Sequence, residues 1–376
     1  MTIYLDNMAA TPVDPRVADH HRAAMTENPA NPNSSEHALG IKSQEAIDQA
    51  GRTLVRAVGA ESEHVLFTPG ASAALWIAVE DAIGRASGRL ARVVATEVEH
   101  PALLAALRRA EADGRLTLSL IGVDEDGAPR LELAENALKD GADLLCTMAA
   151  NNEVGTISDI GGLSALAVRF GARHLVDASQ AAGRTDMSAA LGADLIVVSG
   201  AKAYGPRRAG VLIGKLSGHA SRLAHDVFGT PDAPSALALA FAFSLRATES
   251  RADEARIATM RDALQSVLMA HVPGLRVNGA LASRLPGSLH VSTPHLPGEA
   301  AIGRLWGKIA LSSGAACQSG VPGPSHVLSA MAIPDWAREG AIRIGIGRFN
   351  TEDEIAQAGE MIAAALNAGT PSRRYA

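Results

Sequence analysis

Short apolar runs alternate with helical patterns through the first half of the chain. Each run has the length of a buried parallel strand, and the runs span His64–Phe67, Arg92–Ala95, Leu116–Ile121, Leu144–Met148, His174–Val176 and Leu195–Val198. Helical stretches separate most of these runs. The alternation predicts an α/β fold with a mainly parallel sheet, helices on both faces, and ligand-binding residues at the carboxyl ends of the strands.

The patterns on either side of this region are different. Before it, the sequence is typical of a strand over Ile3–Leu5, a loop over Asn28–Ser35 and a helix over Ile47–Val58. After it, we expect a long helix over Asp253–His271, strands over Ser288–Ser292, Ala310–Ser312 and Ala341–Ile344, and helices over 300–306 and 351–366. This change of pattern predicts a domain boundary near residue 250.

Composition and charge exclude several classes of protein. Hydrophobic residues make up 47% and charged residues 20% of the chain, which excludes a disordered or collagen-like protein. The net charge of -6 and the lack of long basic runs argue against direct nucleic-acid binding. The sequence contains neither a signal-peptide pattern nor about 18 consecutive apolar residues, so we expect a cytoplasmic protein without a membrane segment.

Lysine is scarce, and one lysine stands out by its place in the pattern. Of the five lysines, only Lys202 directly follows a buried strand and lies among small residues. A lysine near a desolvated strand end loses its proton more easily and can form a Schiff base. An ordinary turn lysine is the alternative interpretation of the same position.

Other polar residues also follow the predicted strands. The segment Thr68–Ser72 precedes a helix, whose free amides and the Ser72 hydroxyl would bind an anion. His100, Asn152 and Asp177 stand just beyond three other strands, where ligands gather. Each has a structural alternative: a helix cap for Ser72 and Asp177, a structural or surface role for His100, and turn chemistry for Asn152.

The two cysteines are too few and too far apart for a disulfide framework or a cysteine-based metal site. Cys146 lies inside an apolar run and is expected in the core. Cys317 lies among Gly, Ser, Ala and Pro, so we expect an exposed thiol on a flexible loop, which suits a nucleophile. Arg343 interrupts a late apolar strand, and its fork geometry suits the carboxylate of an amino acid.

An anion site, a histidine for stacking, a strand-end aspartate, a strand-end lysine and a late arginine are together what pyridoxal 5'-phosphate (PLP) needs from a protein. With the loop cysteine added, the sequence resembles the cysteine desulfurases of the NifS and IscS type, within the class V aminotransferase family of fold-type I PLP enzymes. The resemblance runs nearly end to end, through YLDNMAATP, VLFTPGAS, TEVEHPA, NNEVGTISDI, HLVDASQAAG, SGAKAYGP, RLPGSLHVS, SSGAACQSG and IRIGIGRFNTEDEI.

This resemblance implies an α/β fold with a seven-stranded, mainly parallel sheet in a large PLP-binding domain, residues 14–249. Residues 1–13 and 250–376 would form a smaller α+β domain that carries the catalytic cysteine loop. Lys202 would hold PLP as a Schiff base and then move protons, and His100 would stack on the ring. Asp177 would pair with the pyridine nitrogen, and Gln180 would contact the ring hydroxyl.

The resemblance also implies the remaining site residues. Those matching phosphate-binding positions are Ala71, Ser72, Ser199 and Thr230, of which Thr230 would reach the phosphate of the partner subunit in a homodimer. Asn152 and Arg343 match positions that bind the substrate carboxylate. Cys317 matches the cysteine that forms the persulfide. No metal ligand is implied.

Several positions depart from the pattern of that family. Ala201 stands where a histidine usually helps to hold the phosphate, so either PLP binds less tightly or another donor substitutes. Ser72 replaces a threonine, Ala73-Ala74-Leu75 replaces an Asn-bearing stretch, Val227-Phe228 replaces an Arg-Ser pair, and Arg207-Arg208 replaces a Lys-Gly pair. These changes affect phosphate and dimer contacts more than the reacting centre.

We therefore expect an enzyme that converts L-cysteine to L-alanine and leaves the sulfur as a persulfide on Cys317. The expected partner is a sulfur-acceptor protein, and an iron-sulfur scaffold is favoured over acceptors that serve tRNA or DNA modification. Two alternatives remain open at this point. One is another class V PLP enzyme, such as an aminotransferase or a selenocysteine lyase. The other is a weakly active scaffold that docks sulfur-accepting proteins.

Overall fold

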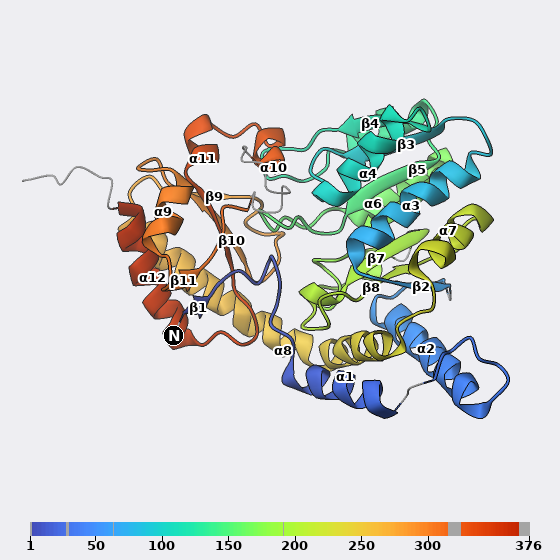
Figure 1. Cartoon of the computed structure of the whole chain (residues 1–376). Coiled ribbons are helices and arrows are strands. Elements are labelled where there is room, and N and C mark those ends of the chain that lie inside the picture. Colours follow the sequence, from blue (N-terminus) through green and yellow to red (C-terminus); the bar gives the residue numbers. More distant parts are fainter. Residues whose placement is uncertain (1, 28–29, 63, 191, 315–324, 368–376) are drawn as a thin grey trace, which may run out of the picture.

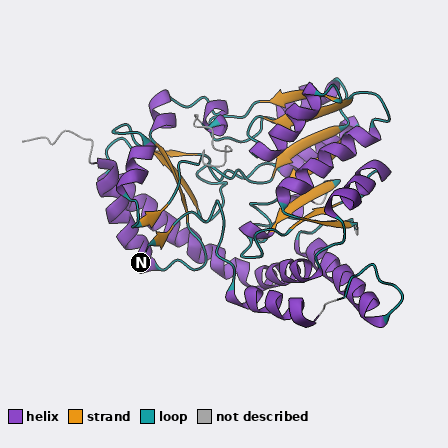
Figure 2. Ribbon diagram, viewed as in Figure 1, coloured by secondary structure: helices purple, strands orange, loops and turns teal. Residues whose placement is uncertain are grey.

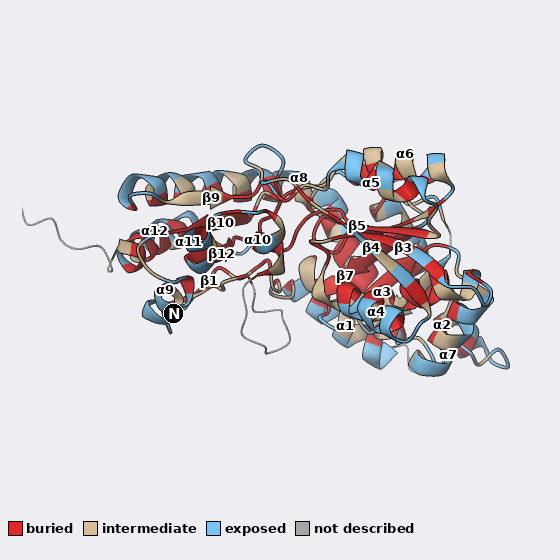
Figure 3. Cartoon of the chain, turned by 90° about the horizontal axis from the view of Figure 1, so that it is seen from above, coloured by how far each residue is buried: buried red, intermediate tan, exposed pale blue. Residues whose placement is uncertain are grey.

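Two bodies of unequal size make up the molecule, and one long helix joins them (Figure 1). The structure is a computed structural model of the chain, and it describes residues 2–27, 30–62, 64–190, 192–314 and 325–367. Strands lie inside each body and helices lie outside (Figure 2). Buried residues follow the strands and the inner faces of the helices (Figure 3), so each body has its own hydrophobic core.

A seven-stranded sheet forms the centre of the larger body. In spatial order its strands are β2 (Val65–Thr68), β8 (Gly210–Ile213), β7 (Leu195–Ser199), β6 (Arg173–Asp177), β5 (Leu144–Met148), β3 (Ala91–Thr96) and β4 (Leu116–Ile121). Only β8 runs antiparallel to its neighbours, and the other paired strands are parallel. The predicted α/β fold with a mainly parallel sheet is confirmed.

Helices cover both faces of this sheet, because successive strand residues point to opposite sides. The helices of this body are α1 (Pro15–Glu27), α2 (Ala38–Ala57), α3 (Ala71–Arg85), α4 (Pro101–Ala112), α5 (Leu131–Lys139), α6 (Ile160–Phe170) and α7 (Gly218–Phe228). One face packs against α3, α4 and α7 and includes Cys146, while the other packs against α2, α5 and α6 and includes Leu145. The predicted burial of Cys146 is thus confirmed.

The smaller body is an α+β unit made of both ends of the chain. Its strands are β1 (Ile3–Tyr4), β9 (Arg276–Asn278), β10 (Ser288–Ser292), β11 (Ile309–Ala310) and β12 (Ala341–Gly345). Antiparallel pairing gives the order β12-β10-β9, and β1 pairs with β11 in parallel. The helices are α9 (Gly298–Arg304), α10 (His326–Ala330), α11 (Asp335–Glu339) and α12 (Glu352–Asn367).

The helix that joins the two bodies is α8 (Ala233–His271), 39 residues long. We expected a helix from Asp253 onward, and it begins earlier because the preceding stretch is rich in alanine, the strongest helix former. Phe243 packs in the core of the larger body and Leu264 in the core of the smaller one. A boundary near residue 250 would fall inside this helix and stays a prediction. No helix in the described parts of the chain is long and apolar enough to cross a membrane.

A buried histidine on β6 forms hydrogen bonds to β5 and α6. The ring of His174 lies between two hydroxyl groups, with Nε2 2.7 Å from Thr147 Oγ1 and Nδ1 2.8 Å from Ser164 Oγ. Burial lowers the pKa of His174 to about 3, so its ring is neutral in the folded protein. Below the ordinary pKa of about 6.5, the unfolded chain takes up this proton first, and acid therefore destabilises the fold.

We predict that the His174→Asn variant shows a flatter dependence of stability on pH than the wild-type chain. Between pH 7.5 and pH 5, protonation of His174 in the unfolded chain costs the wild type about 2 kcal/mol, a loss that the asparagine side chain of the variant avoids because it does not titrate. Denaturant unfolding at the two pH values measures this difference. The control is His225→Asn on the exposed surface of α7, which should keep the wild-type slope. Equal slopes for the His174→Asn variant and the wild type would contradict the prediction.

Candidate active site

Several of the expected site residues meet at one edge of the sheet. The parallel register pairs Met148 of β5 with Asp177 of β6, and Asp177 with Val197 of β7, so these strands end side by side. Lys202 closes the short 3-10 turn that follows β7. A cavity of about 250 Å³ opens at this edge, and the expected residues that line it are Ala71, Ser72, His100, Asn152, Asp177, Gln180, Ser199 and Lys202.

One end of the cavity is the start of α3. The N-cap position is Gly70, which has a φ of 110° and no side chain to bind the free amides of the first turn. A glycine is also required at Gly210 on β8, because a Cβ there would lie 2.5 Å from the Gly70 carbonyl carbon and 2.7 Å from the Ala71 nitrogen. The uncapped helix start, with Ser72 beside it, forms an anion site of the kind that binds a phosphate.

His100 forms one wall of the cavity at the start of α4. Its Nδ1 accepts a hydrogen bond of 3.1 Å from the Ala102 N–H, which fixes the orientation of the ring. Burial lowers the pKa of His100, although the Asp177 carboxylate acts in the opposite direction. A neutral ring in a fixed orientation is suited to stack on a flat heterocycle.

Glu99, next to His100, is a carboxyl group behind the wall of the cavity. It is fully buried, and its Oε1 accepts hydrogen bonds from the Thr96 hydroxyl at 2.5 Å and from the Met148 N–H at 3.0 Å. Burial raises the pKa of Glu99 to about 8. Glu99 therefore holds a proton at neutral pH, which leaves Asp177 as the carboxylate of the cavity.

Asp177 ends β6, and its Oδ1 accepts a hydrogen bond of 2.9 Å from the Ser179 N–H. Ser179 also lines the cavity, and its buried Oγ has no hydrogen-bond partner among the residues that the structure describes. The Gln180 Nε2 atom donates to the Met8 carbonyl at 2.9 Å. The Asp177 carboxylate and the Ser179 hydroxyl thus both line the cavity, where a polar ligand would be their partner.

The N-terminal segment contributes backbone carbonyls to the lysine. The Lys202 Nζ atom donates to the Met8 carbonyl at 3.1 Å and to the Ala9 carbonyl. The same segment continues along the lysine turn, where the Thr11 N–H donates to the Ala201 carbonyl at 2.9 Å. Lys202 is therefore held at the edge of the cavity by a chain segment that is distant in sequence.

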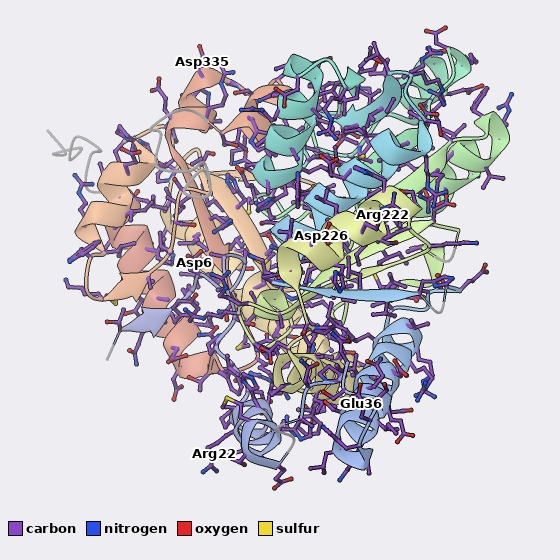
Figure 4. The ribbon with its side chains drawn as sticks, turned by 45° about the vertical axis from the view of Figure 1, so that its right-hand side comes forward. Asp6, Arg22, Glu36, Arg222, Asp226 and Asp335 are labelled. Atoms are coloured by element: carbon purple, nitrogen blue, oxygen red, sulfur yellow. The ribbon has the colours of Figure 1, made fainter. Side chains whose placement is uncertain are left out.

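Arg343 on β12 does not line the cavity. Its side chain is 1% exposed, and it donates to the Asn152 carbonyl at 3.0 Å and to Asp6 Oδ1 at 2.9 Å. Asp6 also accepts a hydrogen bond from the Ser312 hydroxyl, and it lies beside the strands of the smaller body (Figure 4). Arg343 is thus close to Asn152, and its ion pair with Asp6 separates it from open solvent.

One further expected residue lies outside the cavity. Thr230 lies in a second cavity, between β2, α7 and the start of α8, where it accepts a hydrogen bond of 3.3 Å from the Asn33 side-chain amide. A single chain does not bring Thr230 to the cavity that contains Lys202. Cys317 lies outside the described residues.

Two cationic residues near the site were not among the expected site residues. Arg207 lines the cavity together with Ala201 and Lys202. Arg184 lies behind the lysine and donates to the Lys202 carbonyl. Two features of the sequence point to these residues. Arg184 stands four residues after Gln180, and Arg207 belongs to the basic pair that follows the lysine turn.

The residues of the cavity fit PLP. The uncapped start of α3 suits its phosphate, the neutral His100 ring suits its flat ring, and the Asp177 carboxylate suits a protonated ring nitrogen. The Lys202 amine suits its aldehyde. The fold and this cavity define a PLP-dependent enzyme of the α/β class.

Comparisons with known proteins agree with this class and name a family within it. The family described as "Aminotransferase class-V" matches residues 3–226. A cysteine desulfurase IscS from Shewanella baltica is 32% identical over 98% of this chain and 93% of its own length. A probable mitochondrial cysteine desulfurase from Dictyostelium discoideum is 31% identical over 94% of this chain and 80% of its own length.

A solved structure of a NifS-like protein superimposes with a TM-score of 0.86 at 27% identity, and the match covers 98% of this chain and 100% of the other. The chain belongs to the aminotransferase class-V family, in which its close relatives are cysteine desulfurases.

We predict that Gly210→Ala weakens the binding of PLP by about tenfold, because the added Cβ would push the Gly70–Ala71 backbone out of its turn. Absorbance titration of the apoprotein with PLP measures the dissociation constant. The control is Gly303→Ala, since a Cβ at Gly303 on α9 would meet no described atom within 4 Å apart from the neighbouring backbone of its own helix. An unchanged dissociation constant in the Gly210→Ala variant would show that the start of α3 does not bind the phosphate.

Proposed function

We propose that this chain is a cysteine desulfurase that converts L-cysteine to L-alanine and keeps the sulfur as a persulfide on Cys317. The observation that carries the proposal is the cavity in which Lys202, Asp177, His100 and the uncapped start of α3 come together. The cysteine desulfurases among its relatives match nearly the whole chain, which supports the choice of L-cysteine as the substrate.

PLP, when bound, supplies an electron sink for the bonds at the Cα and Cβ atoms of the substrate. The Lys202 amine would hold the cofactor through its aldehyde and, once free, would take the Cα proton of the substrate. The Asp177 carboxylate would hold a proton at the ring nitrogen. The His100 ring would stack on the heterocycle and exclude water from that side.

Cys317 accepts the sulfur in a step that balances without an external oxidant. Its thiolate attacks the sulfur of the substrate, so that the new sulfur-sulfur bond forms while the carbon-sulfur bond breaks. The electron pair of the broken bond stays with the carbon skeleton, which takes up protons and leaves as L-alanine. The products are therefore L-alanine and the persulfide on Cys317.

The substrate carboxylate binds at Asn152 and Arg343 in this proposal. Asn152 lines the cavity, and Arg343 donates to its carbonyl. Arg343 is paired with Asp6, so the substrate carboxylate approaches a guanidinium that already has one carboxylate partner. The substrate carboxylate either replaces Asp6 at the Arg343 guanidinium or shares the guanidinium with it. This requirement makes the subsite selective for an anion over a neutral polar group.

The proposal includes a homodimer in the cytoplasm. Thr230 completes the phosphate site of the partner subunit, which explains why it lies away from the cavity of its own chain. The reducing cytoplasm keeps the Cys317 thiol available between turnovers. The sulfur then passes to an acceptor protein, and we favour iron-sulfur cluster assembly as its use.

Arg207 is the donor that substitutes for the missing histidine at position 201. Both residues line the cavity, and a guanidinium binds phosphate oxygens strongly. We predict that Arg207→Ala raises the dissociation constant of PLP by about tenfold, and that Arg207→Ala combined with Ala201→His recovers part of the loss. Absorbance titration measures both variants.

The control for this prediction is Arg109→Ala, which removes an arginine whose guanidinium pairs with Asp113 on the exposed face of α4. This variant should bind PLP like the wild type. If Arg207→Ala also binds PLP like the wild type, a group other than Arg207 holds the phosphate.

We predict that Cys317→Ser lowers the release of L-alanine from L-cysteine by about a hundredfold in the presence of a reductant, while PLP binding stays unchanged. Cys146→Ala is the matched control for the only other cysteine, which is buried in the core with its pKa raised by burial. This control should retain most of the activity. Alanine and sulfide are measured together, and alkylation followed by mass spectrometry detects the persulfide.

The same assays separate the proposal from its alternatives. Transamination without sulfide release, retained in Cys317→Ser, would identify an aminotransferase. Preference for selenocysteine with little turnover of cysteine would identify a selenocysteine lyase. A chain that gains no absorbance with added PLP would be a scaffold, and the proposed function would be wrong.

A further inference from the structure

Arg184 is a buried arginine that contacts the backbone of the proposed cofactor lysine. It follows β6, and only 8% of its surface is exposed. Its Nε and Nη2 atoms donate to the Lys202 carbonyl at 3.1 Å and 2.7 Å. Two donors on one carbonyl hold the lysine backbone in a single position, which a single flexible contact would not do.

The same guanidinium binds two other parts of the site. Nη2 donates to the Asn7 carbonyl at 3.3 Å, and Nη1 lies 3.5 Å from Met8 Sδ and 3.4 Å from Gln180 Oε1. The carbonyl of Met8 in turn accepts from both Gln180 and Lys202. Arg184 thus joins the lysine turn, the N-terminal segment and the turn after β6 into one unit.

The hydrogen-bond acceptors of Arg184 are all neutral among the described residues. Other buried arginines of the chain differ in this respect, since Arg246 pairs with Asp253 and Glu254, and Arg343 pairs with Asp6. The Arg184 charge acts through space on the buried Glu254 carboxyl, where it lowers a pKa that burial raises. The guanidinium also lies against the main chain of Lys202, and a nearby cation disfavours a second positive charge on the lysine.

We propose that Arg184 is a positioning residue for Lys202, which fixes the lysine at the edge of the cavity and favours its neutral, nucleophilic amine. This inference rests on the proposed function, because it assumes that Lys202 reacts with the aldehyde of PLP. It adds a role to a residue that does not line the cavity.

Other charged and titratable groups also surround Lys202 and Arg184. His100, Asp177 and Arg207 share the cavity with the lysine, Asp6 lies at the N-terminal segment, and Tyr204, Arg246 and Glu254 lie on the side of α8. None of these groups is itself substituted when Arg184 alone is replaced. A change in the pH dependence of the lysine therefore reports the loss of Arg184.

The test measures covalent capture of pyridoxal, the phosphate-free aldehyde, by the apoprotein. Borohydride traps the adduct, and peptide mass spectrometry locates it on Lys202, so the readout needs neither turnover nor the phosphate site. We expect Arg184→Met to slow capture at pH 7.5 by about tenfold and to raise the pH midpoint of capture by about one unit. Arg184→Lys keeps the charge and should keep the midpoint.

Arg256 on α8 provides a matched control. Like Arg184, it donates to backbone carbonyls, those of Arg348 at 2.5 Å and Asn350 at 2.9 Å, and it lies 3.7 Å from the sulfur of a methionine, Met260. Arg256→Met removes a similar set of contacts away from the cavity. It should lower the melting temperature while the rate and the pH midpoint of capture remain those of the wild type.

The inference is overturned if folded Arg184→Met captures pyridoxal with the wild-type rate and midpoint. If Arg184→Met does not fold, Arg184→Gln keeps a donor near the Lys202 carbonyl and removes the charge, and an unchanged midpoint in this variant is equally decisive. A wild-type chain that captures no pyridoxal on Lys202 would instead overturn the proposed function. The two failures are therefore distinguishable.

Discussion

The parallel pairing of β5, β6 and β7 is the constraint on which the site depends. Parallel strands end at the same edge of a sheet. The register that pairs Met148 with Asp177 therefore fixes which residues meet at that edge. The turn after β7 must then deliver Lys202 to that edge. A slip of one residue would turn Asp177 to the opposite face of the sheet and into a helix layer. The hydrophobic residues that fix this register therefore also fix the chemistry.

A second constraint holds the two bodies together near the lysine. Arg348 of the smaller body lies 3.1 Å from Asp14 and 2.5 Å from Glu249, which belong to the segment before α1 and to α8. The Arg348 N–H also donates to the Tyr204 hydroxyl at 2.9 Å, two residues beyond Lys202. Because charge-assisted contacts hold this junction, the position of the smaller body is coupled to the lysine turn.

Much of this arrangement could be predicted from sequence, because buried parallel strands are continuous apolar runs and polar residues after them stand out. Lys202, His100 and Asp177 were found in this way. The strands β8 and β9 were missed, since β8 is only four residues long between glycines and β9 only three. Arg184 was missed because its role comes from the N-terminal segment folding back onto it, a contact that no local pattern contains.

The charges of the site follow from burial as much as from residue type. Burial raises the pKa of Glu99 to about 8 and lowers that of His100, so both groups are neutral beside Asp177 at neutral pH. The Asp177 carboxylate then shares the cavity with the start of α3 and with Arg207, both of which favour an anion. This polarity matches a ligand with a cationic ring at one end and an anionic phosphate at the other. Because the neutral forms of Glu99 and His100 depend on the exclusion of water, the hydrophobic packing around the strand ends determines the electrostatics of the site.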